Sequence, residues 1–307
     1  MRWLITGGTG FLGTNLLRSL NSTDGEVIVL SRTPARWKLE HPHIRFIEQD
    51  IREIDVYKNL LTPETVVVHM AASTYPGKAE KAIESDIHDN LLTTVRLAQI
   101  CAERKVHSFI FLSTGGAIYG EQAVQPISEL ALPFPRTVYG AMKLSTEEYL
   151  RVLHHLNGLP VAMLRVGNAF GPWHPGRGQG AINVFMHNVL LGEPITIWGD
   201  GSVVRDYVPA QDVAAAIRVV AEHFHAGCEA YNVATSQGRS LNDVLGAIKN
   251  LTEKPVQVNY EPARIVDVQK NVLDCRKIHE AFGWKSETLF QVALADTWNW
   301  MKEQTVS

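Results

Sequence analysis

Close to its start the chain contains the segment Thr6-Gly7-Gly8-Thr9-Gly10-Phe11-Leu12-Gly13, with glycines spaced Gly-x2-Gly-x2-Gly. Residues 2–6 before it are apolar and indicate a buried strand, and residues 11–20 after it place leucines at a helical spacing. Glycines in such a strand–turn–helix let the backbone approach a pyrophosphate, and the helix N-terminus supplies amide donors. The last glycine lets the helix pack closely on the strand. We therefore predict a dinucleotide site; a glycine-rich turn without a ligand is the alternative. The expected contacts are Gly7, Thr9, Gly10, Phe11, Leu12 and Gly13.

The segments after this motif alternate between short apolar runs and helical patterns. The expected strands are 2–6, 26–30, 44–47, 65–70, 108–112 and 161–166, and the expected helices are 11–20, 83–104 and 138–155. Strands that are almost continuously Val, Ile and Leu are typical of a parallel sheet covered on both faces. The predicted fold class is therefore α/β, a doubly wound parallel (Rossmann) sheet with a smaller C-terminal α/β lobe that binds substrate.

The character of the sequence changes after residue 166. Residues 167–206 are rich in glycine and proline and indicate loops around one helix near 181–191. A helix at 212–223, a short strand at 230–233 and two or three helices within 240–307 are expected beyond it. We predict a dinucleotide-binding domain of residues 1–166 to which 207–236 return, and a nucleotide-sugar-binding domain of 167–206 and 237–307.

The composition is that of an ordinary folded protein. Of 307 residues, 45% are hydrophobic and 20% charged, which argues against a disordered, collagen-like or coiled-coil chain. A net charge of -3 argues against a general nucleic-acid binder, and no apolar run reaches the roughly 18–20 residues that span a bilayer. The N-terminus lacks a signal-peptide pattern, and the three scattered cysteines suggest neither disulfides nor a metal site. We therefore expect a cytoplasmic protein without a metal, a membrane partner or a nucleic-acid partner.

The end of the second expected strand bears on the type of dinucleotide. It reads Leu30-Ser31-Arg32, without the acidic residue that often holds the ribose 2′-hydroxyl of NAD. Because a guanidinium suits a phosphate, Ser31 and Arg32 favour NADP over NAD. Alternatively, Arg32 is a solvated surface residue or stacks on the adenine. Asp50 and Ile51, after the third strand, could hold and pack the adenine.

Tyr139 and Lys143 stand four residues apart at the start of an expected helix, so both lie on one face. An ammonium near a phenol favours the phenolate, so Lys143 is expected to lower the pKa of Tyr139 and make it an acid or base near neutral pH. The same lysine could hydrogen-bond a nicotinamide ribose. An exposed helical pair is the alternative, but the glycine motif upstream strengthens the catalytic interpretation.

Ordered motifs over nearly the whole chain resemble one family. The matching segments are TGGTGFLG (6–13), HMAA (69–72), FLSTGGAIYG (111–120), YGAMK (139–143), RVGNAFGP (165–172) and WGDGSVVRDYVPAQDVA (198–214). Together they resemble the extended short-chain dehydrogenase/reductases, specifically the NAD-dependent epimerase/dehydratase family that acts on nucleotide sugars, and most of all its 4-epimerases.

The resemblance implies roles for further residues. It implies that Met70, Ala71, Ala72 and Asn90 lie beside the cofactor. It implies that Asn168, Arg205 and Arg264 bind the substrate diphosphate, and Ser73 and Gly115 are further expected substrate contacts. Two separated arginines and an amide suit a ligand with about two negative charges.

One position departs from the family pattern. The catalytic hydroxyl of the 4-epimerases falls at Gly115, which has no side chain, whereas Ser113 and Thr114 precede it. Either Thr114 reaches the sugar through a shifted loop, or Tyr139 works with less help; we favour Thr114. Gly115-Gly116-Ala117 also lacks the acids that the 4,6-dehydratases use to eliminate water.

The leading hypothesis is an NAD(P)-dependent nucleotide-sugar 4-epimerase with Tyr139, Lys143 and Thr114 as catalytic residues. The alternatives are an NADPH-dependent nucleotide-4-keto-sugar reductase, which Arg32 would support, and more distantly a non-catalytic dinucleotide sensor. The resemblance also implies a homodimer formed through the helices at 83–104 and 138–155. Leu91, Leu92, Val95 and Leu97 lie there, although packing on the chain's own sheet explains them equally well.

Overall fold

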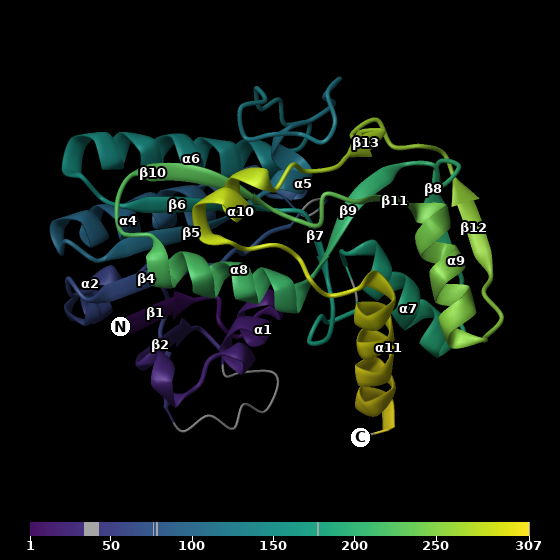
Figure 1. The fold of residues 1–307 in the computed structure, drawn as a ribbon, viewed down its shortest axis with the longest axis horizontal. Coiled ribbons are helices and arrows are strands. Elements are labelled where there is room, and N and C mark those ends of the chain that lie inside the picture. The colour runs from purple at the N-terminus through teal and green to yellow at the C-terminus, as the bar shows by residue number, and fades with distance from the viewer. Residues whose placement is uncertain (34–42, 76, 78, 177, 307) are drawn as a thin grey trace.

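A seven-stranded parallel sheet forms the centre of the computed structural model, which describes residues 1–33, 43–75, 77, 79–176 and 178–306 (Figure 1). The strand order is β10-β6-β5-β4-β1-β2-β3, and every neighbouring pair is parallel. The strands are β1 (Arg2–Thr6), β2 (Glu26–Ser31), β3 (Ile44–Glu48), β4 (Thr65–His69), β5 (Ser108–Thr114), β6 (Val161–Val166) and β10 (Cys228–Val233). The order reverses between β1 and β4, so the predicted doubly wound sheet is confirmed.

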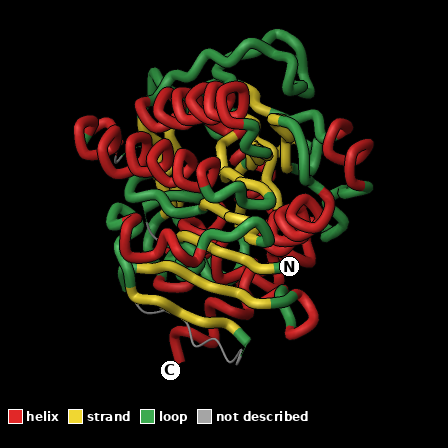
Figure 2. The backbone as a smooth tube through the Cα atoms, turned by 90° about the vertical axis from the view of Figure 1, so that its left-hand side faces the viewer, coloured by secondary structure: helices red, strands yellow, loops and turns green. Residues whose placement is uncertain are grey.

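Helices cover both faces of this sheet, as Figure 2 shows. One face packs on α1 (Phe11–Ser19), α8 (Ala210–His223) and α10 (Arg276–Phe282), and the other on α2 (Ile54–Tyr57), α4 (Thr93–Glu103) and α6 (Val138–Asn157). Side chains alternate along each strand, so Trp3 and Ile5 join the first core while Leu4 joins the second. The apolar runs of the sequence are therefore buried on both sides.

A smaller α/β lobe lies beside the sheet, at the right of Figure 1. Its strands are β7 (Asn168–Phe170), β8 (Ile195–Trp198), β9 (Val204–Pro209), β11 (Gly238–Ser240), β12 (Val258–Glu261) and β13 (Lys270–Asn271). Helices α7 (Ala181–Leu191), α9 (Leu241–Thr252) and α11 (Phe290–Val306) surround its core. We expected only loops and one helix over 167–206, because strands of two to six residues leave little periodic pattern.

The expected helix at 83–104 consists of three parts. They are α3 (Ile83–Asp86), a π-helical segment η4 (Ile87–Leu92) and α4. Short helical turns also occur at η1 (Ser22–Asp24), η2 (Lys58–Leu60), η3 (Ala79–Lys81) and α5 (Gly115–Ile118). In the described part of the chain, no helix is long and apolar enough to cross a membrane.

Candidate active site

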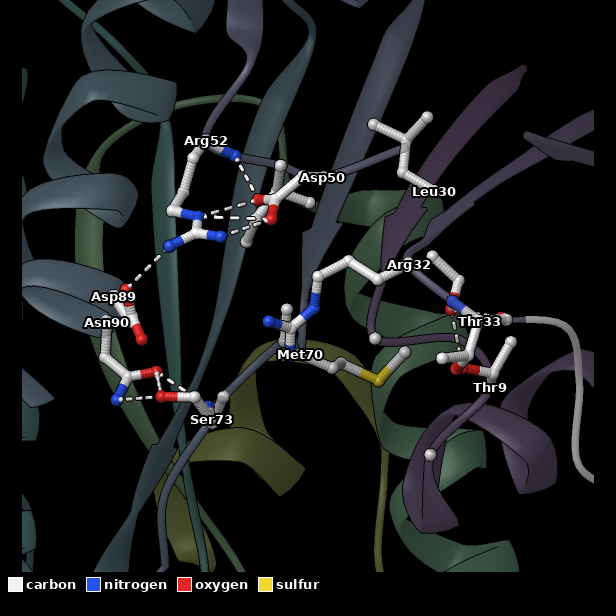
Figure 3. Close-up of a pocket in the computed structure, with 16 residues that line it drawn as sticks. Thr9, Leu30, Arg32, Thr33, Asp50, Arg52, Met70, Ser73, Asp89 and Asn90 are labelled. Atoms are coloured by element: carbon white, nitrogen blue, oxygen red, sulfur yellow. Dashed lines mark hydrogen bonds and ion pairs between the residues drawn. The ribbon is translucent and has the colours of Figure 1, made fainter. Parts of the chain in front are cut away.

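A cavity of about 490 Å³ opens at the carboxyl ends of β1, β2, β3 and β4 (Figure 3). This edge includes the point where the strand order reverses between β1 and β4, where open α/β sheets bind their ligands. Its lining contains twelve of the predicted site residues: Gly7, Thr9, Gly10, Ser31, Arg32, Asp50, Ile51, Met70, Ala71, Ala72, Ser73 and Asn90. The sequence interpretation did not include Leu30, Thr33, Arg52 and Asp89, which also line it.

The glycine loop fits a pyrophosphate. Gly7 has φ +73°, and a Cβ on it would fall 2.6 Å from the backbone nitrogen of Ala71 at the end of β4. A Cβ on Gly13 would fall 2.3 Å from the Gly7 oxygen, so this glycine lets α1 pack onto the loop. Gly10 is the N-cap residue of α1 and has no side chain. The first amides of the helix are therefore open to an anion.

Not every predicted cofactor residue lies on the cavity wall. Leu12 packs against the core, and Phe11 meets the His174 ring edge-on with centroids 4.8 Å apart. Like Gly13 and Lys143, they are outside the set of lining residues. These four residues therefore shape or support the site rather than line the cavity.

The end of β2 presents hydroxyls and a guanidinium. The hydroxyls of Thr9 and Ser31 are 2.8 Å apart, and Ser31 donates to the carbonyl oxygen of Thr33 at 2.7 Å. The exposed side chain of Arg32 extends over the cavity toward Met70 (Figure 3). Arg32 is therefore placed to meet a ligand, not turned away from the cavity.

Asp50 is engaged by a neighbour that the sequence interpretation missed. The Arg52 guanidinium contacts both its carboxylate oxygens, at 2.7 Å from Nη2 and 3.0 Å from Nε, and reaches Asp89 at 3.2 Å (Figure 3). The hydrogen bond from Arg52 holds the pKa of Asp50 below its usual value. The Asp50 carboxylate, which we expected to hold the adenine, is thus already paired within the chain. The presence of an arginine two residues later could have indicated this pairing from the sequence.

Tyr139 and Lys143 lie in the first turns of α6, whose N-terminus is capped by Thr137 accepting from the amide of Gly140 at 3.1 Å. The Lys143 ammonium is buried, donates to the carbonyl oxygen of Leu112 at 2.7 Å and lies 5.9 Å from the centre of the Tyr139 ring. Lys143 thus points toward the end of β5, with the Tyr139 ring nearby.

The expected lowering of the Tyr139 pKa is wrong for this arrangement. Burial raises the pKa of Tyr139 to about 12, and the charge of Asp86 raises it further. Burial also lowers the pKa of Lys143 to about 8, against the opposing charges of Glu147 and Asp86. Desolvation outweighs the attraction that the i, i+4 spacing suggested.

The end of β5 separates the two hydroxyls that the sequence left as candidates. Ser113 is buried and donates to Oε1 of Glu147 at 2.5 Å, whereas Thr114 is partly exposed. A Cβ on Gly115 would fall 2.3 Å from a methyl carbon of Leu273 and 2.9 Å from the carbonyl oxygen of Arg165. Position 115 therefore has no room for a side chain, and Thr114 carries the available hydroxyl.

Asn168 adjoins the same turn. It lies on β7, and its Oδ1 would be 3.1 Å from a Cβ on Gly116. This buried oxygen accepts no hydrogen bond from the described residues. Within the described part of the chain, this acceptor is therefore left without a donor beside the turn that follows Thr114.

The two predicted phosphate-binding arginines meet at one carboxylate. Arg264 donates to Asp267 at 2.8 and 2.9 Å, and Nη2 of Arg205 lies 3.8 Å from the same group. Arg239, absent from the sequence interpretation, is paired with Arg205 across β9 and β11. None of the three lines the cavity at the carboxyl ends of β1–β4.

Comparison with known proteins gives a consistent result. The family model described as "NAD dependent epimerase/dehydratase family" matches residues 3–234. The UDP-glucose 4-epimerase of Mycolicibacterium smegmatis is 31% identical over 306 residues, covering 96% of both chains.

Two solved structures share the whole fold. The UDP-glucose 4-epimerase of Thermotoga maritima with UDP-glucose is 32% identical, with a TM-score of 0.92 over 99% of this chain and 100% of that one. The UDP-glucose 4-epimerase of Thermus thermophilus in complex with NAD is 32% identical, with a TM-score of 0.89 over 98% of this chain and 99% of that one.

Proposed function

The chain belongs to the NAD-dependent epimerase/dehydratase family, and from this premise we propose that it is an NAD-dependent 4-epimerase of UDP-sugars. The observation that carries the proposal is the meeting of two elements at the end of β5. A Cβ on Gly140 would fall 2.4 Å from the carbonyl oxygen of Ala117, so the start of α6 lies directly against the 114–117 turn. This packing supports the proposal that Tyr139, Lys143 and Thr114 form one catalytic site.

The residues divide the work by their chemistry. Tyr139 takes the proton of the sugar C4 hydroxyl and later returns it, which requires the positive charge of bound NAD to lower the raised pKa of this phenol. Thr114 hydrogen-bonds the same oxygen. A dinucleotide held by the Gly7–Gly13 loop would supply a hydride acceptor for C4 and the hydride that returns to the opposite face of the sugar. The Lys143 ammonium, held by Leu112, supplies positive charge beside the phenol. Asn168, Arg205 and Arg264 hold the diphosphate of the substrate.

The cavity is proposed to hold the dinucleotide, with the pyrophosphate at Gly7–Gly13. No carboxylate ends β2, and Arg32 reaches over the cavity, so we propose that the site accepts NADP in addition to NAD. This proposal goes beyond the relatives, one of which is solved with NAD.

We also propose that the chain forms a cytoplasmic homodimer. Leu97 is in the core and Val95 packs against it, so these two residues are not available to a partner. Exposed apolar side chains nevertheless occur on α3–η4 and on α6: Ile83, Ile87, Leu92, Tyr149, Val152 and Leu156. The division into domains of 1–166 with 207–236, and of 167–206 with 237–307, is likewise a proposal. The place of β10 in the large sheet supports it, whereas α10, from the second domain, also packs on that sheet. Sedimentation velocity of the purified chain tests the dimer.

The experiment that tests the function is a turnover assay without reductant. UDP-glucose is incubated with the protein and catalytic NAD, and inversion at C4 is followed by proton NMR. Appearance of UDP-galactose supports the proposal. A reaction that requires stoichiometric NADPH and a 4-keto sugar would instead identify a reductase. The control is Tyr139→Phe, which should bind NAD with unchanged affinity and lose about 10²-fold or more in kcat.

A further inference from the structure

A buried acidic residue that the proposed function does not use lies beside the candidate catalytic residues. Asp86 is the last residue of α3 and is fully buried. The π-helical segment η4 follows it at once and carries Asn90. Both α3 and η4 pack against α6, the helix that bears Tyr139 and Lys143, and the charge of Asp86 acts on both residues.

The orientation of the Asn90 side chain identifies the groups that donate hydrogen bonds to Asp86. The Ser73 amide donates to Oδ1 of Asn90 at 2.9 Å, which fixes the orientation of this side chain. Nδ2 of Asn90 therefore donates to Oδ1 of Asp86 at 2.7 Å and to the hydroxyl of Thr74 at 3.0 Å. The Thr74 hydroxyl, already accepting, gives its own proton to the same Asp86 oxygen. Asp86 thus anchors the segment after β4 that lines the cavity.

The other carboxylate oxygen of Asp86 is different. It is buried and accepts no hydrogen bond from the residues that the structure describes. A buried acidic group without a second set of donors is costly unless a charge nearby compensates it. The buried ammonium of Lys143 is such a charge, and it has one hydrogen-bond acceptor among the described residues, the carbonyl of Leu112.

We propose that Asp86 is a positioning residue, which anchors Ser73 through Asn90 on one side and balances the buried ammonium of Lys143 on the other. It does not touch the ligand, because both its oxygens are inside the protein. Asp86 thus connects two parts of the proposed active site, the loop after β4 and the start of α6.

Several charged groups surround this pair. From α6, Tyr139 and Glu147 lie near the Asp86–Lys143 pair. Glu147 is itself paired with Arg165 at 2.7 Å. From β4, His69 is buried between the hydroxyls of Thr6 and Thr94, at 2.7 and 2.8 Å, and its pKa is lowered to about 3 by burial.

From η4, Asp89 is occupied by Arg52 and His88, while η3 contributes the exposed Glu80 and Lys81. Glu147 and Asp86 are the two groups whose charges raise the pKa of Lys143 against burial. Glu147 is also paired with Arg165. Removal of Asp86 therefore takes away one of the two negative charges that raise the pKa of Lys143.

The test is a pH titration that does not depend on activity. Lysine labelled with carbon-13 at Cε is introduced into the full chain, and the Lys143 signal is assigned by its loss in Lys143→Met. We expect the titration midpoint of Lys143 to move from about 8 to lower pH by about one pH unit in Asp86→Asn. The matched control is Glu84→Gln, an exposed acid on the same helix, which should leave the midpoint in place. An unchanged midpoint in Asp86→Asn overturns the charge-balancing role.

The anchoring role has its own variant. Thr74→Val keeps the charge of Asp86 and removes one of its hydrogen bonds. We expect KM for the UDP-sugar to rise about 3–10-fold while the Lys143 midpoint stays in place. An unchanged KM overturns this half, and the variant also provides a test if Asp86→Asn does not fold.

The KM readout rests on the proposed function, whereas the titration does not. A wild-type chain that fails to epimerise UDP-sugars would contradict the proposed function. In that case, a Lys143 midpoint that moves to lower pH in Asp86→Asn would still support the charge-balancing role of Asp86.

Discussion

Ser113 gives its hydroxyl proton to Glu147, and the same carboxylate accepts from Nε and Nη2 of Arg165 at 3.1 and 2.7 Å. All three side chains are buried, so Ser113 belongs to the ion pair beneath the site and not to the reacting surface. This supports the proposal that Thr114, the next residue, carries the reacting hydroxyl. We expect Thr114→Val to lower kcat about 10- to 100-fold with little loss of stability.

The matched variant is Ser113→Ala. It leaves one acceptor of Glu147 unused and should lower the free energy of unfolding by about 1–2 kcal/mol, with kcat within a factor of about three. Steady-state kinetics and urea denaturation of both variants decide the matter. The opposite pattern, with Ser113→Ala inactive and Thr114→Val active, would contradict the assignment.

The absence of a side chain at position 115 has a steric cause that can be tested. Gly115→Ser restores the hydroxyl at the family position but drives Cβ into Leu273 and the Arg165 carbonyl. We expect a loss of about 1–3 kcal/mol in unfolding free energy and lower activity. In a double-mutant cycle the serine should cost less stability in a Leu273→Ala background than in the wild type, because its nearest obstacle is gone. A stable, fully active single variant would show that the turn adapts.

The sequence identified the fold because its strongest signals are local. Gly7 and Gly13 are required by close backbone contacts, and these glycines follow directly from the motif. Six of the seven strands of the large sheet are apolar runs long enough to recognise. The short strands of the smaller lobe were missed because they depend on partners distant in sequence: β13 pairs with β9, more than 60 residues earlier.

The site was predictable only in part, for the same reason. We favoured Thr114 over Ser113 from the sequence, but the physical reason, the buried hydrogen bond of Ser113, depends on Glu147, 34 residues later. Leu273, which closes position 115, is more than 150 residues away. The sign of the Tyr139 pKa change depends on burial and on Asp86, neither of which the Tyr-x3-Lys pattern contains.

Arg32 provides a test of cofactor choice. Its exposed guanidinium over the cavity should pair with a 2′-phosphate, and this interaction is absent with NAD. We expect Arg32→Ala to weaken NADP binding about 10-fold, equivalent to about 1.4 kcal/mol, and to leave NAD binding within about twofold. Isothermal titration calorimetry with both dinucleotides measures this, and Arg45→Ala, an exposed arginine on β3, is the control. Equal losses for both cofactors would mean that Arg32 contacts the adenine or the pyrophosphate instead.

Because Lys143 is buried, its contribution to the stability of the chain depends on pH. Its pKa is lowered from 10.5 to about 8, so the folded chain loses this proton at lower pH than the unfolded chain does. Between about pH 8 and 10.5 the unfolded chain binds the extra proton, and the contribution of Lys143 to the free energy of unfolding therefore rises with pH. Below about pH 8 both states are protonated, and the cost of the buried ammonium, roughly 3 kcal/mol, is fully present.

Lys143→Met removes this cost along with the ammonium. The variant should be inactive and yet more stable than the wild type at pH 7, by about 1–2 kcal/mol once the unpaired Leu112 carbonyl is counted. Its advantage should shrink as pH is raised toward 10, where the wild-type lysine is neutral in the folded state. Urea denaturation of both chains at pH 7 and at pH 9.5 measures the difference, and the comparison cancels the other groups that titrate there. A variant less stable than the wild type at pH 7, by a margin that does not change with pH, would mean that the ammonium is held by its contacts at no net cost. In that case Lys143 would stabilise the fold, and its buried ammonium would not be a destabilising group that is kept for catalysis.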